Sequence, residues 1–226
     1  MCPSKNFSQT TSLSESFLNF LAHSMLADSA SFQWRCSSEE REGLLAGAII
    51  CDFHKGRVNQ DWPRELVAGI ALHRRIDALS NKSESVKSTN SFYPTKLRRF
   101  VPIYFDILAD HFLANHWASW SNRALKDLTS DTYHALNKFG VFNPQKNMEF
   151  VSFMRKKDLL AGYQHWSNIE LATSSVMKRM GSPELSEHSI QSMGSALEKC
   201  EVSFRSCLNE MREHTANWSA FDSSSG

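Results

Sequence analysis

Apolar residues return every three or four positions along most of this chain, which is the spacing of one face of an α-helix. Leu21 and Met25 belong to the first such stripe, which predicts a helix over about residues 15–28. Strict alternation of apolar and polar residues, the pattern of a half-buried strand, is nearly absent. The pattern therefore predicts an all-α protein.

Helix boundaries follow from prolines, glycines and polar stretches. A second helix should begin at Glu39 and end between Phe53 and Gly56, since glycine is a common helix stop. A third should open at Pro63, whose missing N–H does no harm in a first turn, and run to about Leu79. The polar segments expected to be loops are residues 29–38 and 80–91. The further helices expected are at about residues 103–120, 122–139, 146–161, 163–180 and 187–216.

Length and composition place these helices in one domain. A chain of 226 residues fits a single domain, and its fifteen Phe and six Trp are enough for a sizeable core. There is no internal repeat and no obvious linker. We expect a single-domain helical bundle over residues 17–216, with a disordered Ser/Thr-rich leader at 1–16 and a flexible tail at 217–226.

Charge, cysteines and hydropathy exclude several classes of protein. The net charge of +1 argues against a nucleic-acid coat protein or an acidic tail protein. Five cysteines without a C-x-x-C pair favour reduced thiols over a disulfide framework or a zinc ribbon. No apolar run approaches the ~20 residues of a membrane span, and residues 1–16 lack the apolar core of a signal peptide. We therefore expect a soluble cytoplasmic protein that binds neither membrane nor nucleic acid.

Acidic residues and histidines interrupt the apolar faces of the predicted helices. A carboxylate buried without a partner costs several kcal/mol or takes up a proton, so several in one chain indicate a shared partner. A cation is the simplest shared partner, and bundles commonly assemble metal sites from side chains on facing helices. The residues that four predicted helices could direct to one centre are His23, Asp52, His73, Asp77, Asp110 and His111.

Spacing within the helices supports this set. His73 and Asp77 are four residues apart and so lie one turn apart on one face. Asp106 and Asp110 repeat that spacing, and we expect Asp106 to orient a ligand rather than to bind metal. Asp52 is the strongest candidate, because the helix dipole disfavours a negative charge near a C-terminus and no capping role is available there.

The chemistry of these residues suits a divalent cation and a phosphate. Histidine and aspartate without cysteine favour Mn²⁺, Mg²⁺, Fe²⁺ or Zn²⁺. Such a cation with an open position can activate water and neutralise a phosphate oxygen. Arg74 and Arg75 fit this chemistry, since a guanidinium can bind a phosphate through two hydrogen bonds. The set therefore predicts a metal site that acts on a phosphate ester.

Several segments of the chain, over about residues 17–120, resemble the acyl carrier protein phosphodiesterase family. The matching segments are residues 18–23 (LNFLAH), 47–53 (GAIICDF), 67–77 (VAGIALHRRID), 98–106 (RRFVPIYFD), 110–113 (DHFL) and 116–117 (HW). The first and third of these are together quite specific. The chain departs from the family pattern at Met25, where relatives often have histidine, at Asn81, where they often have aspartate, and in a longer segment 29–41.

The resemblance implies a helical fold distantly similar to that of the HD phosphohydrolases. It also implies Mn²⁺-dependent hydrolysis of holo-acyl carrier protein to apo-acyl carrier protein and 4′-phosphopantetheine, with Mg²⁺ or another divalent cation as a substitute. By position in the motifs, Asp52 is implied to be essential. Under this hypothesis the catalytic residues are Asp52, His73, Asp77 and Arg74. Acyl carrier proteins are small and acidic, so the residues expected to contact the substrate are Arg75, Arg98 and Arg99.

Two alternatives stay open, because each spacing taken alone also fits an ordinary ion pair. One is a metal-dependent phosphohydrolase that acts on a different phosphate ester, such as a nucleotide. The other is a helical binding module without catalytic activity, in which the Asp/His cluster is a structural metal site or an ion-pair network. Bound metal and turnover of a phosphodiester would separate an enzyme from a binding module.

Overall fold

The computed structural model describes residues 20–54, 56–59, 61–143 and 145–221, and every regular element in these ranges is a helix. The predicted all-α fold is confirmed. The α-helices are α1 (Phe20–Gln33), α2 (Ser38–Phe53), α3 (Arg64–Ser80), α4 (Glu84–Ser88), α5 (Val101–Asn115), α6 (Leu125–Lys138), α7 (Gln145–Lys157), α8 (Leu159–Gly162), α9 (Trp166–Arg179) and α10 (Ser186–Ala216). The 3-10 helices are η1 (Thr89–Phe92), η2 (Thr95–Phe100), η3 (Trp117–Ser119), η4 (Gly140–Phe142) and η5 (Pro183–Leu185). The expected leader at 1–16 lies outside the described residues.

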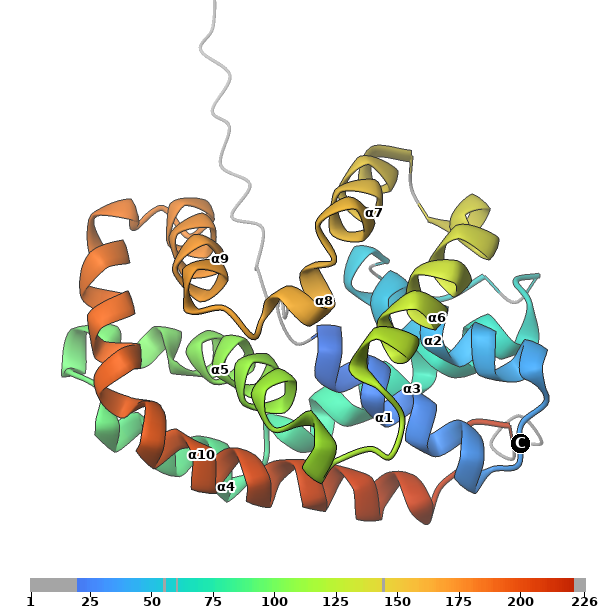
Figure 1. Cartoon of the computed structure of the whole chain (residues 1–226), viewed down its shortest axis with the longest axis horizontal. Helices are drawn as coiled ribbons and strands as arrows, with labels where there is room; N and C mark the ends of the chain where they lie inside the picture. The colour runs from blue at the N-terminus through green and yellow to red at the C-terminus, as the bar shows by residue number, and fades with distance from the viewer. Residues whose placement is uncertain (1–19, 55, 60, 144, 222–226) are drawn as a thin grey trace, which may run out of the picture.

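The helices are arranged around the 31-residue α10, which curves along one side of the molecule (Figure 1). It packs against α9 and α5 near its start and against α1, α3 and α4 further along. Helices α1, α2 and α3 form the centre, and α6, α7 and α8 cover the opposite side from α10. Within the described ranges, no helix combines the length and the apolarity needed to cross a membrane.

Helices α2 and α3 make the most extensive contact between any two elements, and small residues allow it. A Cβ atom built on Gly47 of α2 would lie 2.6 Å from the Cα atom of Gly69 on α3. A Cβ atom on Gly43 would collide equally with Glu65. Glycine is therefore required where the two backbones meet, and this pairing brings the end of α2 beside the middle of α3.

The start of α2 agrees with the predicted helix start to within one residue, for a visible reason. The Ser37 side chain accepts a hydrogen bond from the Glu40 N–H, and the Glu40 carboxylate accepts one from the Ser37 N–H. This capping box satisfies two backbone donors that the first turn leaves without partners. The predicted third helix likewise starts one residue after Pro63 in the structure.

Two segments expected to be loops are partly helical. Helix α1 continues to Gln33 because Ser31 is buried, with its hydroxyl donating to the Asp28 carbonyl within the helix. The segment 80–91 contains α4 and part of η1. Polar composition alone therefore suggested loops where serine side chains instead hydrogen-bond to the backbone of their own helix.

The predicted helix at 146–161 differs from the structure. Asp158 has a left-handed backbone conformation, with φ of 44°, and separates α7 from α8. In the expected tail, Trp218 and Phe221 make edge contacts with the ring of Trp34, which directly follows α1. The remaining residues of the expected tail, 222–226, lie outside the described part of the chain.

Candidate active site

Two histidines and an aspartate meet where α1 and α3 cross. His23 lies in the first turn of α1, and His73 and Asp77 lie one turn apart on α3. Their ligand atoms all lie within 4.8 Å of one another. The two oxygens of Asp77 lie 3.2 Å from the Nε2 atoms of His23 and of His73. The imidazole rings stack with centroids 3.8 Å apart, so both direct Nε2 to the same carboxylate.

Asp52 adds a second carboxylate from the last turn of α2. Its Oδ1 atom lies 3.5 Å from His73 Nε2, and its side chain is 6% exposed against 33% for Asp77. Burial raises the pKa of Asp52 above the usual carboxyl range, in opposition to the nearby His73. Burial also acts on Asp77, but hydrogen bonds and charge from His23 and His73 outweigh it and lower the pKa of this carboxyl. The more exposed carboxylate is thus the more strongly ionised one.

The proton on His73 can be assigned from its neighbours. Its Nδ1 atom lies 2.8 Å from the Ala48 carbonyl oxygen, which can only accept, so Nδ1 donates. Nε2 is thereby left to face Asp52 and Asp77. Burial alone would lower the pKa of His73, but these two carboxylates raise it well above its ordinary value. In neutral His73 the Nε2 lone pair is free to bind a cation.

His23 supplies an independent test of whether this group fits a cation. It is 1% exposed, its Nδ1 atom makes no hydrogen bond within the described residues, and Nε2 has Asp77, 3.2 Å away, as its polar partner. Burial, followed by the charge of His73, lowers the pKa of His23 and favours the neutral form. A buried imidazole of this kind, facing a carboxylate, is a suitable metal ligand. The residues present therefore fit a divalent cation.

Asp110 is not part of this group, although the sequence places it among the candidate ligands. Its carboxylate is fully buried and accepts hydrogen bonds from the backbone N–H groups of Leu21 at 3.1 Å and Ala22 at 2.9 Å. Burial raises its pKa well above the usual carboxyl range, against these two hydrogen bonds. Asp110 therefore caps the first turn of α1 and holds the turn that carries His23.

His111 also lies apart from the group. Its Nδ1 atom lies 2.7 Å from the Tyr163 carbonyl oxygen, and its ring makes an edge contact with Trp166. These contacts attach α5 to α8 and α9. The side chains of Asp110 and His111 thus contact different neighbours, because successive residues on a helix differ by about 100° in direction.

The comparison with known proteins decides the family. The family model described as acyl carrier protein phosphodiesterase matches residues 18–211. The chain belongs to the acyl carrier protein phosphodiesterase family. The resemblance found in the sequence is confirmed, and the curated relatives carry the name of a phosphoric diester hydrolase.

Three relatives of this family from Escherichia coli illustrate the similarity. The acyl carrier protein phosphodiesterase of strain O6:H1 is 28% identical over 163 residues, which are 72% of this chain and 79% of the relative. Those of strains O139:H28 and K12 are 36% identical over 104 residues, which are 46% of this chain. In those two alignments the chain spans 48% of the relative's length. No solved structure gives a significant match to the chain.

The four arginines proposed from the sequence lie in different surroundings. Arg74 is exposed and donates to the Gly56 carbonyl at 2.7 Å, so it braces the loop that follows Asp52. Arg75 points to the C-terminal segment, with its guanidinium 4.8 Å from the centre of the Trp218 ring. Of these two, Arg74 lies beside the segment that follows Asp52, and Arg75 lies beside the C-terminal segment.

Arg98 and Arg99 lie in η2, before α5 begins. Arg98 donates to the Tyr93 carbonyl, and Arg99 donates to the Ser182 hydroxyl. Arg99 also lies over the ring of Phe100. Among the described contacts, none joins this pair to His23, His73 or Asp77.

An aromatic cluster beside the site was not singled out from the sequence. Phe53 directly follows Asp52, and its ring lies 6.4 Å from Phe20 on α1 and 5.8 Å from Phe150 on α7. All phenylalanines were expected to be core residues. The spacing of Phe150 and Phe153 among the polar residues of α7 was the available signal that some of them are not.

Proposed function

We propose that the chain hydrolyses the phosphodiester that joins 4′-phosphopantetheine to a serine of holo-acyl carrier protein, releasing apo-acyl carrier protein. The convergence of His23, His73 and Asp77, with ligand atoms within 4.8 Å of one another, is the observation that carries this proposal. Family membership supports the choice of substrate. A shared centre of imidazoles and a carboxylate suits phosphate-ester hydrolysis better than an isolated ion pair does.

The proposed cofactor is a divalent cation, with Mn²⁺ as the first choice. Two imidazoles with carboxylates are donors that Mn²⁺ accepts, whereas Mg²⁺ prefers oxygen ligands and retains several waters. A cation held by His23, His73 and Asp77 would supply Lewis-acid activation of water and neutralise charge on a phosphate oxygen. This choice is tested by metal analysis of the protein.

The side chains have separate tasks in this proposal. His73 is held by the Ala48 carbonyl with Nε2 facing the centre, and Asp110 holds the turn that carries His23. Asp52 completes the donor set, and its buried carboxylate, whose pKa is raised by burial, is suited to accept a proton from the attacking water. Arg74, at the exposed edge, is the group available to contact the scissile phosphate.

We place this reaction in the cytoplasm. The cysteines within the described residues are all free thiols, namely Cys36, Cys51, Cys200 and Cys207. Reduced thiols are the usual state in that compartment.

The decisive experiment substitutes Asp52 and follows the mass of the carrier. Asp52→Asn preserves shape but removes the charge, so we expect turnover to fall at least about 100-fold at saturating Mn²⁺. Intact-mass analysis measures loss of the prosthetic group, and circular dichroism checks that the variant is folded. Asp127→Asn, at an exposed aspartate in the first turn of α6, is the matched control.

Retention of activity within a few-fold in Asp52→Asn would contradict the assignment of this residue. Chelation with EDTA should abolish turnover, and added Mn²⁺ should restore it. A carrier mass unchanged by the wild-type protein, together with turnover of a nucleotide ester, would instead support the alternative phosphohydrolase.

A further inference from the structure

Helix α7 carries an apolar face that the helical core covers only in part. Phe150 and Phe153 are 37% and 49% exposed, while Val151 and Met154 of the same helix are buried. Phe150, Phe153 and Lys157 follow the spacing i, i+3 and i+7, so they share one face. Of the six large apolar side chains that are exposed in the described ranges, three lie between residues 141 and 153. Exposed phenylalanines in adjacent turns indicate a contact surface rather than scattered surface residues.

The last turn of α7 adds positive charge to this face through Lys157, which shares it, and through Lys156 at its edge, whereas Arg155 projects from the other side of the helix. Arg155, Lys156 and Lys157 are consecutive and exposed, and none of the three has an ion-pair partner within the described ranges. Cations at a helix C-terminus are favoured by the helix dipole, which gives each of them a local reason to be there. The dipole gives no reason for the exposed phenylalanines of the preceding turns.

The α7 surface, defined as Phe150, Phe153, Lys156 and Lys157, is continuous with the candidate site. The Phe150 ring lies 5.8 Å from Phe53, which follows Asp52, and 6.2 Å from Phe20, which is three residues before His23. Helix α7 thus contacts the ends of both α1 and α2 that carry site residues. Figure 1 shows α7 at the edge of the molecule opposite the long stretch of α10.

We propose that the α7 surface is the docking surface for the acyl carrier protein, an inference that rests on the proposed function. An acidic carrier complements the two cations Lys156 and Lys157, and exposed phenylalanines beside them supply the apolar centre of an interface. The prosthetic group is attached to the carrier, so docking has to occur next to the metal group. The α7 surface meets this condition, whereas Arg98 and Arg99 lie in η2 and contact Tyr93 and Ser182.

The test compares matched charge reversals in binding and in turnover. Lys156→Glu with Lys157→Glu should weaken binding of holo-carrier to the EDTA-treated protein about tenfold or more, measured by fluorescence anisotropy. With Mn²⁺ present, the same variant should raise KM more than it lowers kcat, and added salt should reduce the difference from wild type. Phe153→Ala should also raise KM, without the salt dependence. The control, Lys82→Glu with Lys126→Glu, changes the net charge equally at exposed positions outside α7.

Each outcome separates this inference from the proposed function. Wild-type turnover of holo-carrier with unchanged KM in the α7 variants overturns the docking surface and leaves the function standing. Carrier binding that depends on α7 without any turnover supports docking and contradicts the function. A larger effect of Arg98→Glu with Arg99→Glu moves docking to η2 and overturns the inference. Two further results would overturn the inference if the α7 variants leave carrier binding unchanged. One is that these variants abolish self-association of the protein, and the other is that they abolish its binding to phosphatidylserine vesicles.

Discussion

Two carboxylates, Asp52 and Asp77, face the Nε2 atom of His73 and raise the pKa of this imidazole well above its ordinary value. Its stacked neighbour His23 is buried, and burial lowers the pKa of His23, so the pKa values of the two adjacent imidazoles shift in opposite directions. A cation can bind Nε2 of His73 only when that atom carries no proton. At the scale of single residues, the group is therefore arranged to exchange a proton for a metal ion.

The effects of substituting His73 and Asp77 should be strongly non-additive. We expect His73→Ala and Asp77→Ala each to lower kcat/KM for holo-carrier at least about 100-fold, and the double variant to be little worse than either. The physical reason is that ligands of one cation cannot be lost independently. The measurement is a double-mutant cycle in kcat/KM, with Mn²⁺ affinity followed by calorimetry.

The control double-mutant cycle uses Glu84 and Lys87 on α4, which form an exposed ion pair three residues apart. Its variants should leave kcat/KM unchanged and alter the free energy of unfolding by at most ~0.5 kcal/mol. If the effects of the His73 and Asp77 variants are also small and additive, the two residues form an ordinary ion pair. That result would contradict their assignment to a metal centre.

At the scale of elements, the site depends on how closely α2 and α3 approach. Gly47 and Gly69 let the two backbones touch, so that the last turn of α2 brings Asp52 to His73. Asp110 of α5 does the same for α1, since it accepts hydrogen bonds from the first-turn N–H groups. Each helix that carries a site residue is thus positioned by a contact outside the site.

Gly47→Ala should damage both stability and activity. The added Cβ would lie 2.6 Å from backbone atoms of Gly69 and Ile70, which cannot move as a side chain can. We expect the free energy of unfolding to fall by about 2 kcal/mol or more and kcat to fall with it, since α2 and α3 must separate. Urea denaturation and carrier turnover measure the two effects.

Gly194→Ala on α10 is the matched control for this substitution. Its Cβ would lie 3.6 Å from Trp166, an ordinary contact distance. Alanine is also the better helix former by roughly 1 kcal/mol, so this variant should be neutral or slightly stabilised. Equal stabilities for the two variants would mean that the close approach of α2 and α3 is not required.

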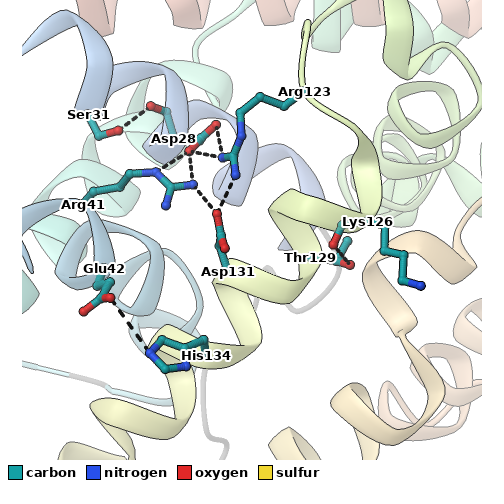
Figure 2. A network of polar contacts seen from close by, with 9 residues as sticks. All are labelled: Asp28, Ser31, Arg41, Glu42, Arg123, Lys126, Thr129, Asp131 and His134. Atoms are coloured by element: carbon teal, nitrogen blue, oxygen red, sulfur yellow. Dashed lines mark hydrogen bonds and ion pairs between the residues drawn. The ribbon is translucent and has the colours of Figure 1, made fainter. Parts of the chain in front are cut away.

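At the scale of the whole molecule, four charges tie α1, α2 and α6 together (Figure 2). Asp28 of α1 and Asp131 of α6 both accept hydrogen bonds from Arg41 of α2 and from Arg123. Burial alone would raise the pKa of Asp131, but Arg123 and Arg41 lower it. The network holds the end of α1 that is far from the site.

Asp28→Ala should lower the free energy of unfolding by about 1–3 kcal/mol at neutral pH, because it leaves two partly buried arginines with one carboxylate between them. Chemical denaturation measures this value, with Glu84→Ala as the exposed control. The lowered pKa of Asp131 means that its contribution is present above the ordinary carboxyl pKa and is lost as pH falls below ~4. The network's contribution should therefore shrink in acid, and an Asp28→Ala effect as small as that of Glu84→Ala would contradict the role of the network.

Helical periodicity, capping residues and i, i+4 spacing depend on neighbours in the sequence. They are therefore sufficient to predict the all-α fold, the starts of α2 and α3, and the pairing of His73 with Asp77 on one face. The segments expected as loops were less predictable, since serine side chains within α1 and near α4 satisfy the backbone locally. The position of His23 and Asp52 within apolar helical segments extended the prediction to these two residues, and the family motifs agreed with it.

Only the tertiary structure decided which buried carboxylate meets the imidazoles. Asp52 and Asp110 are both aspartates within apolar helical segments, yet Asp52 faces His73 and Asp110 caps α1. It also decided that Arg75 lies on Trp218 and that Phe150 of α7 adjoins the site. The physical reason is that burial, hydrogen-bond partners and charge neighbours come from residues far apart in the sequence, which meet only when the helices pack.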